Sequence, residues 1–349
     1  MGNGTCDRWR HFLAGVIVVA WGASAGAATA LAADGDVLKA VQARGYVTCG
    51  FRPTVGFTHS DDDGRLSGFM VDFCHLLAAA VLGDASAIRA ERLPDKPQEF
   101  VAVERHAVDI ALHTTTWTIS RDATYDIAFT TPVFYDGEGF AIRSAHEPGP
   151  LREQNNQPVC VKSPTTTQRN LEDFISQTQR HWTLRLFKTY EEALQAFLAN
   201  ECGMLTTDSS VLAMSLANYR GLGSNIHIFP DVISREPLTP YVAGGDANWL
   251  EIVRSVIFLA ILSEEKGVTA SNARAMRDSP DDEIRRLFGP ASQNGLGLRP
   301  DWATEAIAQV GNYGEIFERN LGEASPYKMR RGLNQLWTRG GLLYSPQLQ

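Results

Sequence analysis

Short apolar runs alternate with amphipathic stretches along the first part of the chain. Residues 107–114 (AVDIALHT) form a short apolar run that ends in a threonine, which is typical of a buried strand. Residues 70–83 (MVDFCHLLAAAVLG) repeat apolar side chains at helical spacing and end at Gly83, a common helix stop. Because strands and helices alternate, the pattern predicts a mostly parallel sheet and an α/β fold.

The same alternation starts again further along the chain. A strand is predicted at 158–162, followed by a helix that begins near Thr166, since Thr165 and Gln168 have capping-box spacing. A second helix and a strand around 202–206 complete the unit. Two segments of similar organisation, joined twice rather than once, predict two lobes with a hinge.

The N-terminal residues 1–33 have the layout of a secretory signal peptide. Two arginines precede an apolar stretch that starts at Phe12, and small residues with several A-x-A options follow. The alternative is an uncleaved membrane anchor, although Gly and Ala dilute the apolar run. We therefore expect cleavage between Ala28 and Ala33 and an exported mature protein.

Composition and charge narrow the class of protein. The chain has 349 residues and is 44% hydrophobic, enough for two sizeable cores. Its net charge is -8 and it has no Lys/Arg-rich run, which argues against a nucleic-acid partner.

Four cysteines remain once Cys6 leaves with the signal peptide, and they are Cys49, Cys74, Cys160 and Cys202. An even number in an exported chain predicts two disulfides, with three connectivities open. A zinc site is the alternative, but the spacing contains no C-x-x-C pair, and we expect no metal.

Hydroxyl groups and a fixed positive charge gather at residues 113–122 (HTTTWTISRD), directly after a predicted strand. Ligands of open α/β sheets bind beyond the carboxyl ends of the strands. The guanidinium of Arg121 offers two parallel hydrogen bonds to a carboxylate, and Thr116 and Thr118 are candidates to complete the shell. The alternative is a surface arginine beside ordinary strand threonines.

The second segment carries complementary chemistry. The free N–H groups of the helix that begins near Thr166 suit an anion. Asp208, at the end of another predicted strand, suits an ammonium group, although a helix cap is the alternative role for it. An arginine, a helix N-terminus and an aspartate together match the two charged groups of an amino acid.

Several motifs in fixed order resemble one known family. They are GFMVDFC, TTTWTISRD, YDGEGFAIR, VCVKSPTTT, TTDSS, ISREPLTPYV, VGNYGEIFERNLG and RGLNQLWTRGGLLYSP, and they span essentially the whole mature chain. The chain resembles the periplasmic general L-amino-acid binding proteins of ABC importers, in the polar amino-acid solute-binding superfamily. The resemblance implies a two-lobed periplasmic-binding-protein fold of type II with two crossing hinge strands. It places lobe one at 34–142 plus 242–349 and lobe two at 143–241.

The resemblance also implies site residues and a disulfide pairing. The ligand residues carried over are Thr114, Thr116 and Arg121 in lobe one and Thr166 and Asp208 in lobe two. The implied disulfides are Cys49–Cys74 and Cys160–Cys202, each within one lobe.

The chain departs from the family pattern near the implied pocket. Pro164 stands where the family usually has Gly, Met70 replaces an Asp, and the stretch around Arg52 is one residue short. Phe51, Phe57 and His113 are candidates for the pocket wall. These departures leave the clamp for the α-amino and α-carboxyl groups intact and the side-chain preference open.

The function implied is a non-enzymatic receptor that captures an L-amino acid between its lobes and delivers it to an ABC transporter permease. We expect a monomer without a cofactor. One alternative is an amino-acid-sensing receptor subunit, and another is a dehydratase-like enzyme on the same fold. An enzyme would need a general acid or base, and His113 is the histidine near the proposed site.

Overall fold

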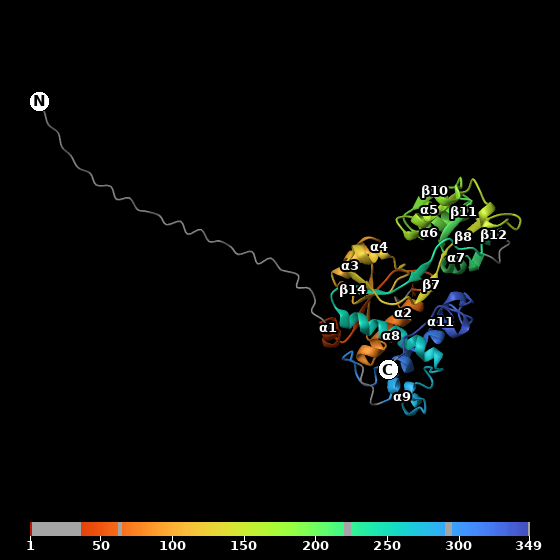
Figure 1. The fold of residues 1–349 in the computed structure, drawn as a ribbon. Helices are drawn as coiled ribbons and strands as arrows, with labels where there is room; N and C mark the ends of the chain where they lie inside the picture. Colours follow the sequence, from red (N-terminus) through yellow and green to blue (C-terminus); the bar gives the residue numbers. More distant parts are fainter. Residues whose placement is uncertain (2–35, 62–64, 220–224, 290–294, 348–349) are drawn as a thin grey trace. The chain divides into compact units, whose positions relative to one another are not determined.

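The computed structural model describes residues 1, 36–61, 65–219, 225–289 and 295–347. The proposed signal peptide therefore lies outside the described residues, apart from Met1. The described residues from 36 onward belong to one compact unit, whose helices and strands are traced in Figure 1.

The first sheet has the strand order β4-β1-β5-β14-β6. β1 pairs in parallel with β4 and β5, whereas β14 is antiparallel to both of its neighbours. The predicted parallel arrangement is therefore confirmed for the first part of this sheet, and β14 joins it after the chain has passed through the second sheet. The strands are β1 (Val47–Phe51), β4 (Ile88–Arg92), β5 (Ile110–Ala111), β6 (Ile127–Phe129) and β14 (Tyr241–Ala243).

The second sheet has the strand order β10-β9-β11-β8-β12. β9 is parallel to β10 and β11, and β8 is antiparallel to β11 and β12. The strand predicted at 158–162 is confirmed as β9, and the one predicted at 202–206 lies two residues later as β11. The strands are β8 (Glu138–Arg143), β9 (Pro158–Lys162), β10 (Thr183–Phe187), β11 (Met204–Asp208) and β12 (Ile226–Ile228).

Two short antiparallel strands, β7 (Phe134–Asp136) and β13 (Glu236–Leu238), carry the chain from the first sheet to the second and back. They are the two crossing strands expected of the fold. β8 belongs to the second sheet, so the expected boundary at 142/143 falls at the end of a strand rather than at the change of sheet. The apolar pattern of β8 could not reveal this, because a buried strand has the same pattern in either sheet.

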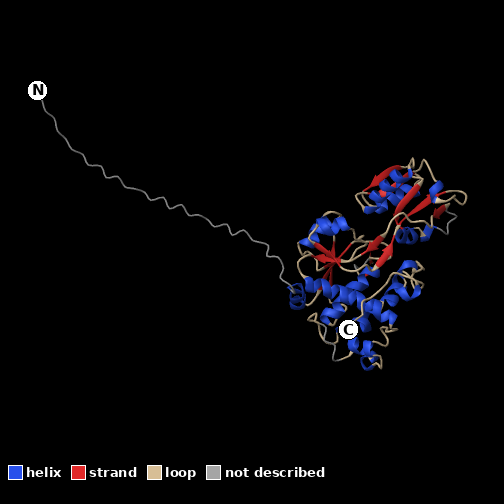
Figure 2. Ribbon diagram, viewed as in Figure 1, coloured by secondary structure: helices blue, strands red, loops and turns tan. Residues whose placement is uncertain are grey.

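Helices cover both sheets (Figure 2). They are α1 (Asp36–Arg44), α2 (Phe69–Leu82), α3 (Gln98–Glu104), α4 (Ile119–Thr124), α5 (Thr166–Thr178), α6 (Tyr190–Leu198), α7 (Ser209–Ser215), α8 (Ala247–Glu265), α9 (Asp282–Phe288), α10 (Trp302–Val310) and α11 (Tyr313–Asn320). A two-stranded ribbon of β2 (His59–Ser60) and β3 (Leu66–Ser67) precedes α2. Single 3₁₀ turns lie at Leu151–Glu153, Ala217–Tyr219, Ala275–Asp278, Gly332–Asn334 and Trp337–Arg339.

Side chains of alternate residues on the second sheet pack on opposite faces, as the pleat of a strand requires. Val159 and Val161 share a core with Leu171 of α5, whereas Cys160 shares a core with Phe197 of α6. Burial on both faces explains why β9 is an uninterrupted apolar run.

The largest core joins the first sheet to α2, α8, α10 and α11. Phe69 of α2 packs edge-on against Tyr313 of α11, with the ring centroids 5.7 Å apart. Met70, the departure from the family pattern, is fully buried in this core. In the described part of the chain, no helix combines the length and apolar character needed to cross a membrane.

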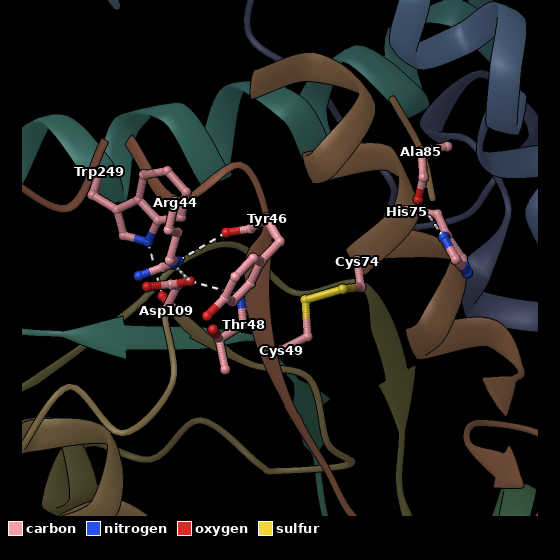
Figure 3. The surroundings of a disulfide bond; sticks show 9 residues. All are labelled: Arg44, Tyr46, Thr48, Cys49, Cys74, His75, Ala85, Asp109 and Trp249. Atoms are coloured by element: carbon pink, nitrogen blue, oxygen red, sulfur yellow. Dashed lines mark hydrogen bonds and ion pairs between the residues drawn. A yellow bond between two sulfur atoms is a disulfide. The ribbon is translucent and has the colours of Figure 1, made fainter. Parts of the chain in front are cut away.

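Both disulfides implied by the resemblance are confirmed. Cys49 of β1 bonds Cys74 of α2, and Cys160 of β9 bonds Cys202 just before β11. Figure 3 shows the first of them beside Asp109, whose carboxylate accepts the backbone N–H of Thr48 at 2.6 Å. The first bond joins a strand to a helix packed on the same sheet, and the second joins segments of the second sheet. Neither bond therefore links the two sheets.

Candidate ligand-binding site

A cavity of about 710 Å³ lies where strands of both sheets end. The segments after β1, β5, β9 and β11 contribute to its walls, which agrees with the rule that ligands bind beyond the carboxyl ends of strands. All five residues predicted to contact the ligand line this cavity, namely Thr114, Thr116, Arg121, Thr166 and Asp208.

Arg121 reaches the cavity from α4. Thr118 caps this helix, because its hydroxyl accepts the backbone N–H of Arg121 at 3.2 Å. We expected Thr118 to line the cavity, but it does not. The Arg121 guanidinium is 7% exposed, donates to the carbonyl oxygen of Thr116 at 2.6 Å and lies 5.4 Å from the ring centroid of Phe100. Among the described residues, no carboxylate forms an ion pair with it within 4.0 Å. This cation is therefore buried and still available to a ligand carboxylate.

Asp208 occupies the N-cap position of α7, but its side chain makes no capping hydrogen bond. Asp136 does this instead, since it accepts the hydroxyl of Ser209 at 2.7 Å and the backbone N–H of Ser210 at 3.3 Å. The helix-cap role considered for Asp208 is therefore wrong. Within the described chain, the Asp208 carboxylate has neither a hydrogen-bond donor nor an ion-pair partner, and it faces the cavity.

The surroundings of Asp208 make its charge unfavourable in the empty protein. Burial raises the pKa of Asp208 well above its usual value of 3.8, and the carboxylates of Asp136 and Glu236 raise it further. The cations Lys96 and Arg121 oppose this shift from the other sheet. A ligand ammonium group beside Asp208 would neutralise the excess negative charge.

Thr116 and Thr166 bring the two halves of the cavity together. Their hydroxyl oxygens lie 3.5 Å apart, although the first follows β5 and the second begins α5. Thr165 caps α5 by accepting the backbone N–H of Gln168 at 3.1 Å, which confirms the predicted helix start. The first backbone N–H groups of α5 lack partners within the helix and suit an anionic ligand group.

Glu236 of β13 is a site residue that the sequence analysis missed. It is 2% exposed, and one of its oxygens accepts the hydroxyl of Thr116 and, at 3.5 Å, that of Thr166. Its other oxygen accepts from Asn170 at 2.7 Å and from Ser234 at 2.9 Å. The sequence analysis predicted no strand here and used this stretch only as part of the motif ISREPLTPYV, so it gave no signal for a buried carboxylate with several donors.

The three candidates for the pocket wall have different locations. His113 lines the cavity, and burial lowers its pKa to about 4, so the imidazole is neutral near pH 7. The structure places Phe51 and Phe57 in the hydrophobic core instead, and neither lines the cavity. Phe57 packs against Phe134 with the ring centroids 5.2 Å apart.

Charged side chains beyond the predicted set also line the cavity. They are Arg52, Arg92, Asp95, Lys96, Lys162 and Glu191. Most of them lie in loops after strands, where hydrophobic periodicity carries no information about which direction a side chain takes.

Known proteins were compared with this chain, and no protein-family model matches it. The general L-amino acid-binding periplasmic protein AapJ of Rhizobium johnstonii is 38% identical over 340 residues, which cover 96% of this chain and 97% of that protein. The glutamate/glutamine/aspartate/asparagine-binding protein BztA of Rhodobacter capsulatus is 38% identical over 319 residues, which cover 90% of this chain and 94% of that protein.

Solved structures agree with these relatives. A periplasmic binding protein of an ABC transporter from Brucella ovis, solved with glutathione bound, has a TM-score of 0.84 and 36% identity over 90% of this chain and 99% of its own. A cysteine-binding protein from Campylobacter jejuni, at 16% identity, has a TM-score of 0.56 over 71% of this chain and 96% of its own, and supports the fold alone. These relatives are binding proteins rather than enzymes, which argues against the dehydratase-like alternative. This chain belongs to the family of periplasmic amino-acid-binding proteins of ABC transporters.

Proposed function

We propose that the cavity holds the zwitterionic part of an L-amino acid, which the chain captures in the periplasm for an ABC permease. Arg121 and the N-terminus of α5 would bind the α-carboxylate, and Asp208 would bind the α-ammonium group. Thr114 and Thr116 would supply further polar contacts. One observation carries the proposal: a buried arginine on α4 and a half-buried aspartate at the end of β11, each without an ion-pair partner in the described chain, line the same cavity.

In this mechanism the ligand stabilises a closed arrangement of the two lobes. It would contact Arg121 after the first sheet and Asp208 at the end of the second, while β7 and β13 act as the hinge. Micromolar affinity corresponds to about -8 kcal/mol, which charge-assisted hydrogen bonds in a desolvated cleft can supply. The closed arrangement would then be the form that the permease recognises.

Several further properties form part of the proposal. Residues 1–33 would be removed as a signal peptide on export to the periplasm. The mature chain would act as a monomer, without nucleic acid. Lobe one would comprise about 34–142 plus 242–349 and lobe two about 143–241. The relative from Brucella ovis, which is named as an ABC transporter binding protein, favours delivery to a permease over the sensing receptor.

Titration calorimetry of the mature protein with a panel of L-amino acids tests the proposal. We expect at least one to bind at micromolar concentration, and Arg121→Ala to weaken that binding at least 100-fold. Arg105→Ala is the matched control, since this arginine is exposed and does not line the cavity. A folded wild-type protein that releases no heat with any amino acid would remove the proposed function.

A further inference from the structure

The cavity contains positive charge that the proposed clamp does not use. The charged residues that line it within the described chain are the cations Arg52, Arg92, Lys96, Arg121 and Lys162 and the carboxylates Asp95, Glu191 and Asp208. When Arg121 and Asp208 are assigned to the α-groups of the ligand, the remaining cations exceed the remaining carboxylates. Glu99 and Glu236 are buried behind the wall and do not line the cavity, and including both would balance these cations, so the excess is a property of the lining alone.

Two of these cations already have partners in the protein. Arg52 pairs with Asp95, donates to the carbonyl oxygen of Pro94 at 3.0 Å and lies 3.8 Å from Glu99. Lys96 Nζ lies 3.5 Å from the carboxylate of Glu99. These contacts hold both side chains against the cavity, so that their positions are set before a ligand arrives.

Lys162 differs from both, because its ammonium group has no hydrogen-bond or ion-pair partner among the described residues. The side chain is partly buried and lines the cavity at the last position of β9. Burial lowers the pKa of Lys162, the neighbouring Arg52 lowers it further, and Asp95 and Glu191 oppose the shift without pairing with it. A partly buried ammonium group that lacks an acceptor is a donor available to a ligand.

The position of Lys162 relates it to the clamp. It ends the strand that leads into α5, and the hydroxyl of Thr165 donates to its backbone carbonyl at 2.7 Å across the intervening turn. Thr166 begins α5 four residues later and lines the same cavity. Lys162 and the N-terminus of α5 therefore belong to the same strand-to-helix connection and line the same cavity.

The cavity also has space for a second ligand group. Its volume of about 710 Å³ lies within the range of about 300–1,000 Å³ for small-molecule sites and exceeds the need of a zwitterion alone. Burial lowers the pKa of Lys96 to about 8, and Arg121, Arg52 and Lys162 contribute to this shift against the opposing charge of Glu99. A ligand carboxylate among these cations would reduce their mutual repulsion.

We propose that Lys162, together with Arg52 and Lys96, forms a subsite for a carboxylate on the ligand side chain, so that the chain selects acidic amino acids over uncharged ones of the same size. This inference rests on the proposed function, because it assumes that the α-groups bind at Arg121 and Asp208. Lys162 is the specificity-determining residue of the subsite, and the paired cations Arg52 and Lys96 supply the supporting positive field.

Calorimetry with L-glutamate and L-glutamine tests the subsite, since the two ligands have nearly the same shape and differ in side-chain charge. We expect wild type to bind glutamate at least tenfold more tightly than glutamine at pH 7. Lys162→Met should weaken glutamate binding at least tenfold and change glutamine binding less than threefold. Lys162→Arg should keep the preference for glutamate, because it restores the positive charge.

Lys188→Met is the matched control, since Lys188 is exposed, lies in the same lobe and does not line the cavity. It changes the net charge by the same amount and should leave both affinities unchanged. Equal binding of the two ligands by wild type would overturn the subsite, as would equal loss of both in Lys162→Met. If uncharged amino acids bind and glutamate does not, the subsite is wrong and the clamp stands. If no amino acid binds, the proposed function itself fails.

Discussion

Two carboxylates near the same cavity, the buried Glu99 and the half-buried Asp208, have opposite surroundings. The first oxygen of Glu99 accepts hydroxyl groups from Thr115 at 2.9 Å and from Tyr241 at 2.6 Å, and its second lies 3.5 Å from Lys96 Nζ. In the described chain, Asp208 has no such donors and faces other carboxylates instead. Of the two, only Glu99 has hydrogen-bond donors on one oxygen and cations beside the other within the protein.

The shifts of their pKa values follow from these contacts. Burial alone would raise the pKa of Glu99, but the charge of Lys96 and the contacts with His113 and Tyr241 hold it well below the usual 4.5. Burial raises the pKa of Asp208 well above 3.8, and neighbouring carboxylates add to the shift. An acid whose pKa is lowered by donors and cations stabilises the folded chain, whereas an acid whose pKa is raised and that has neither is a candidate for contact with a ligand.

The largest expected effect on stability comes from Glu99→Gln. The change removes the charge that compensates Lys96, and breaking a buried ion pair costs about 3 kcal/mol of the free energy of unfolding. Urea unfolding of the empty protein measures this loss. Glu153→Gln, at an exposed position, is the control and should have no measurable effect. Equal stability of the two variants would show that the ion pair of Glu99 with Lys96 does not stabilise the fold.

Asp208→Asn should act in the opposite direction. The amide removes a half-buried charge that repels Asp136 and Glu236, so we expect the ligand-free protein to gain about 1 kcal/mol of stability while amino-acid binding is lost. Unfolding and calorimetry on the same sample separate the two effects. Asp231→Asn, at an exposed position in the same segment of the chain, should change neither. If Asp208→Asn is less stable than wild type, the claim that the Asp208 charge destabilises the fold is wrong.

The smallest effect is the dependence of these differences on pH. The folded-state pKa of Asp208 is raised, so the charged carboxylate destabilises the fold. This loss of stability is complete above the raised pKa and disappears as the pH falls toward 3.8. The folded-state pKa of Glu99 is lowered, so its contribution is complete above about 4.5 and is lost at lower pH. In thermal unfolding between pH 7 and 4, the unfolding temperatures of Asp208→Asn and wild type should therefore converge first as the pH is lowered. The deficit of Glu99→Gln should persist to lower pH, and simultaneous convergence would contradict this order.

Much of the clamp could be predicted from the sequence. Arg121 and Asp208 follow strands, and the helix start at Thr166 has a capping signal that depends on local spacing. Such signals survive folding because they involve residues within one turn. The pairing of the cysteines came from the resemblance, since spacing alone left three connectivities open.

The rest depends on contacts between distant residues. Glu236 accepts hydrogen bonds from Thr116 and Asn170, which lie 120 and 66 residues away in the sequence, and no local pattern encodes those contacts. Phe51 and Phe57 have the same apolar character whether they line a cavity or fill a core, so the sequence could not separate the two roles. The role of Thr118 as a cap was available from its position before α4 and was missed.

The central claim is that one amino acid joins Arg121 to Asp208 across the cavity. A crystal structure of the mature protein with a bound L-amino acid tests it most directly. The account predicts the α-carboxylate within hydrogen-bonding distance of the Arg121 guanidinium and the α-ammonium group beside the Asp208 carboxylate. A ligand bound elsewhere, or in this cavity without contact to these two side chains, would contradict it.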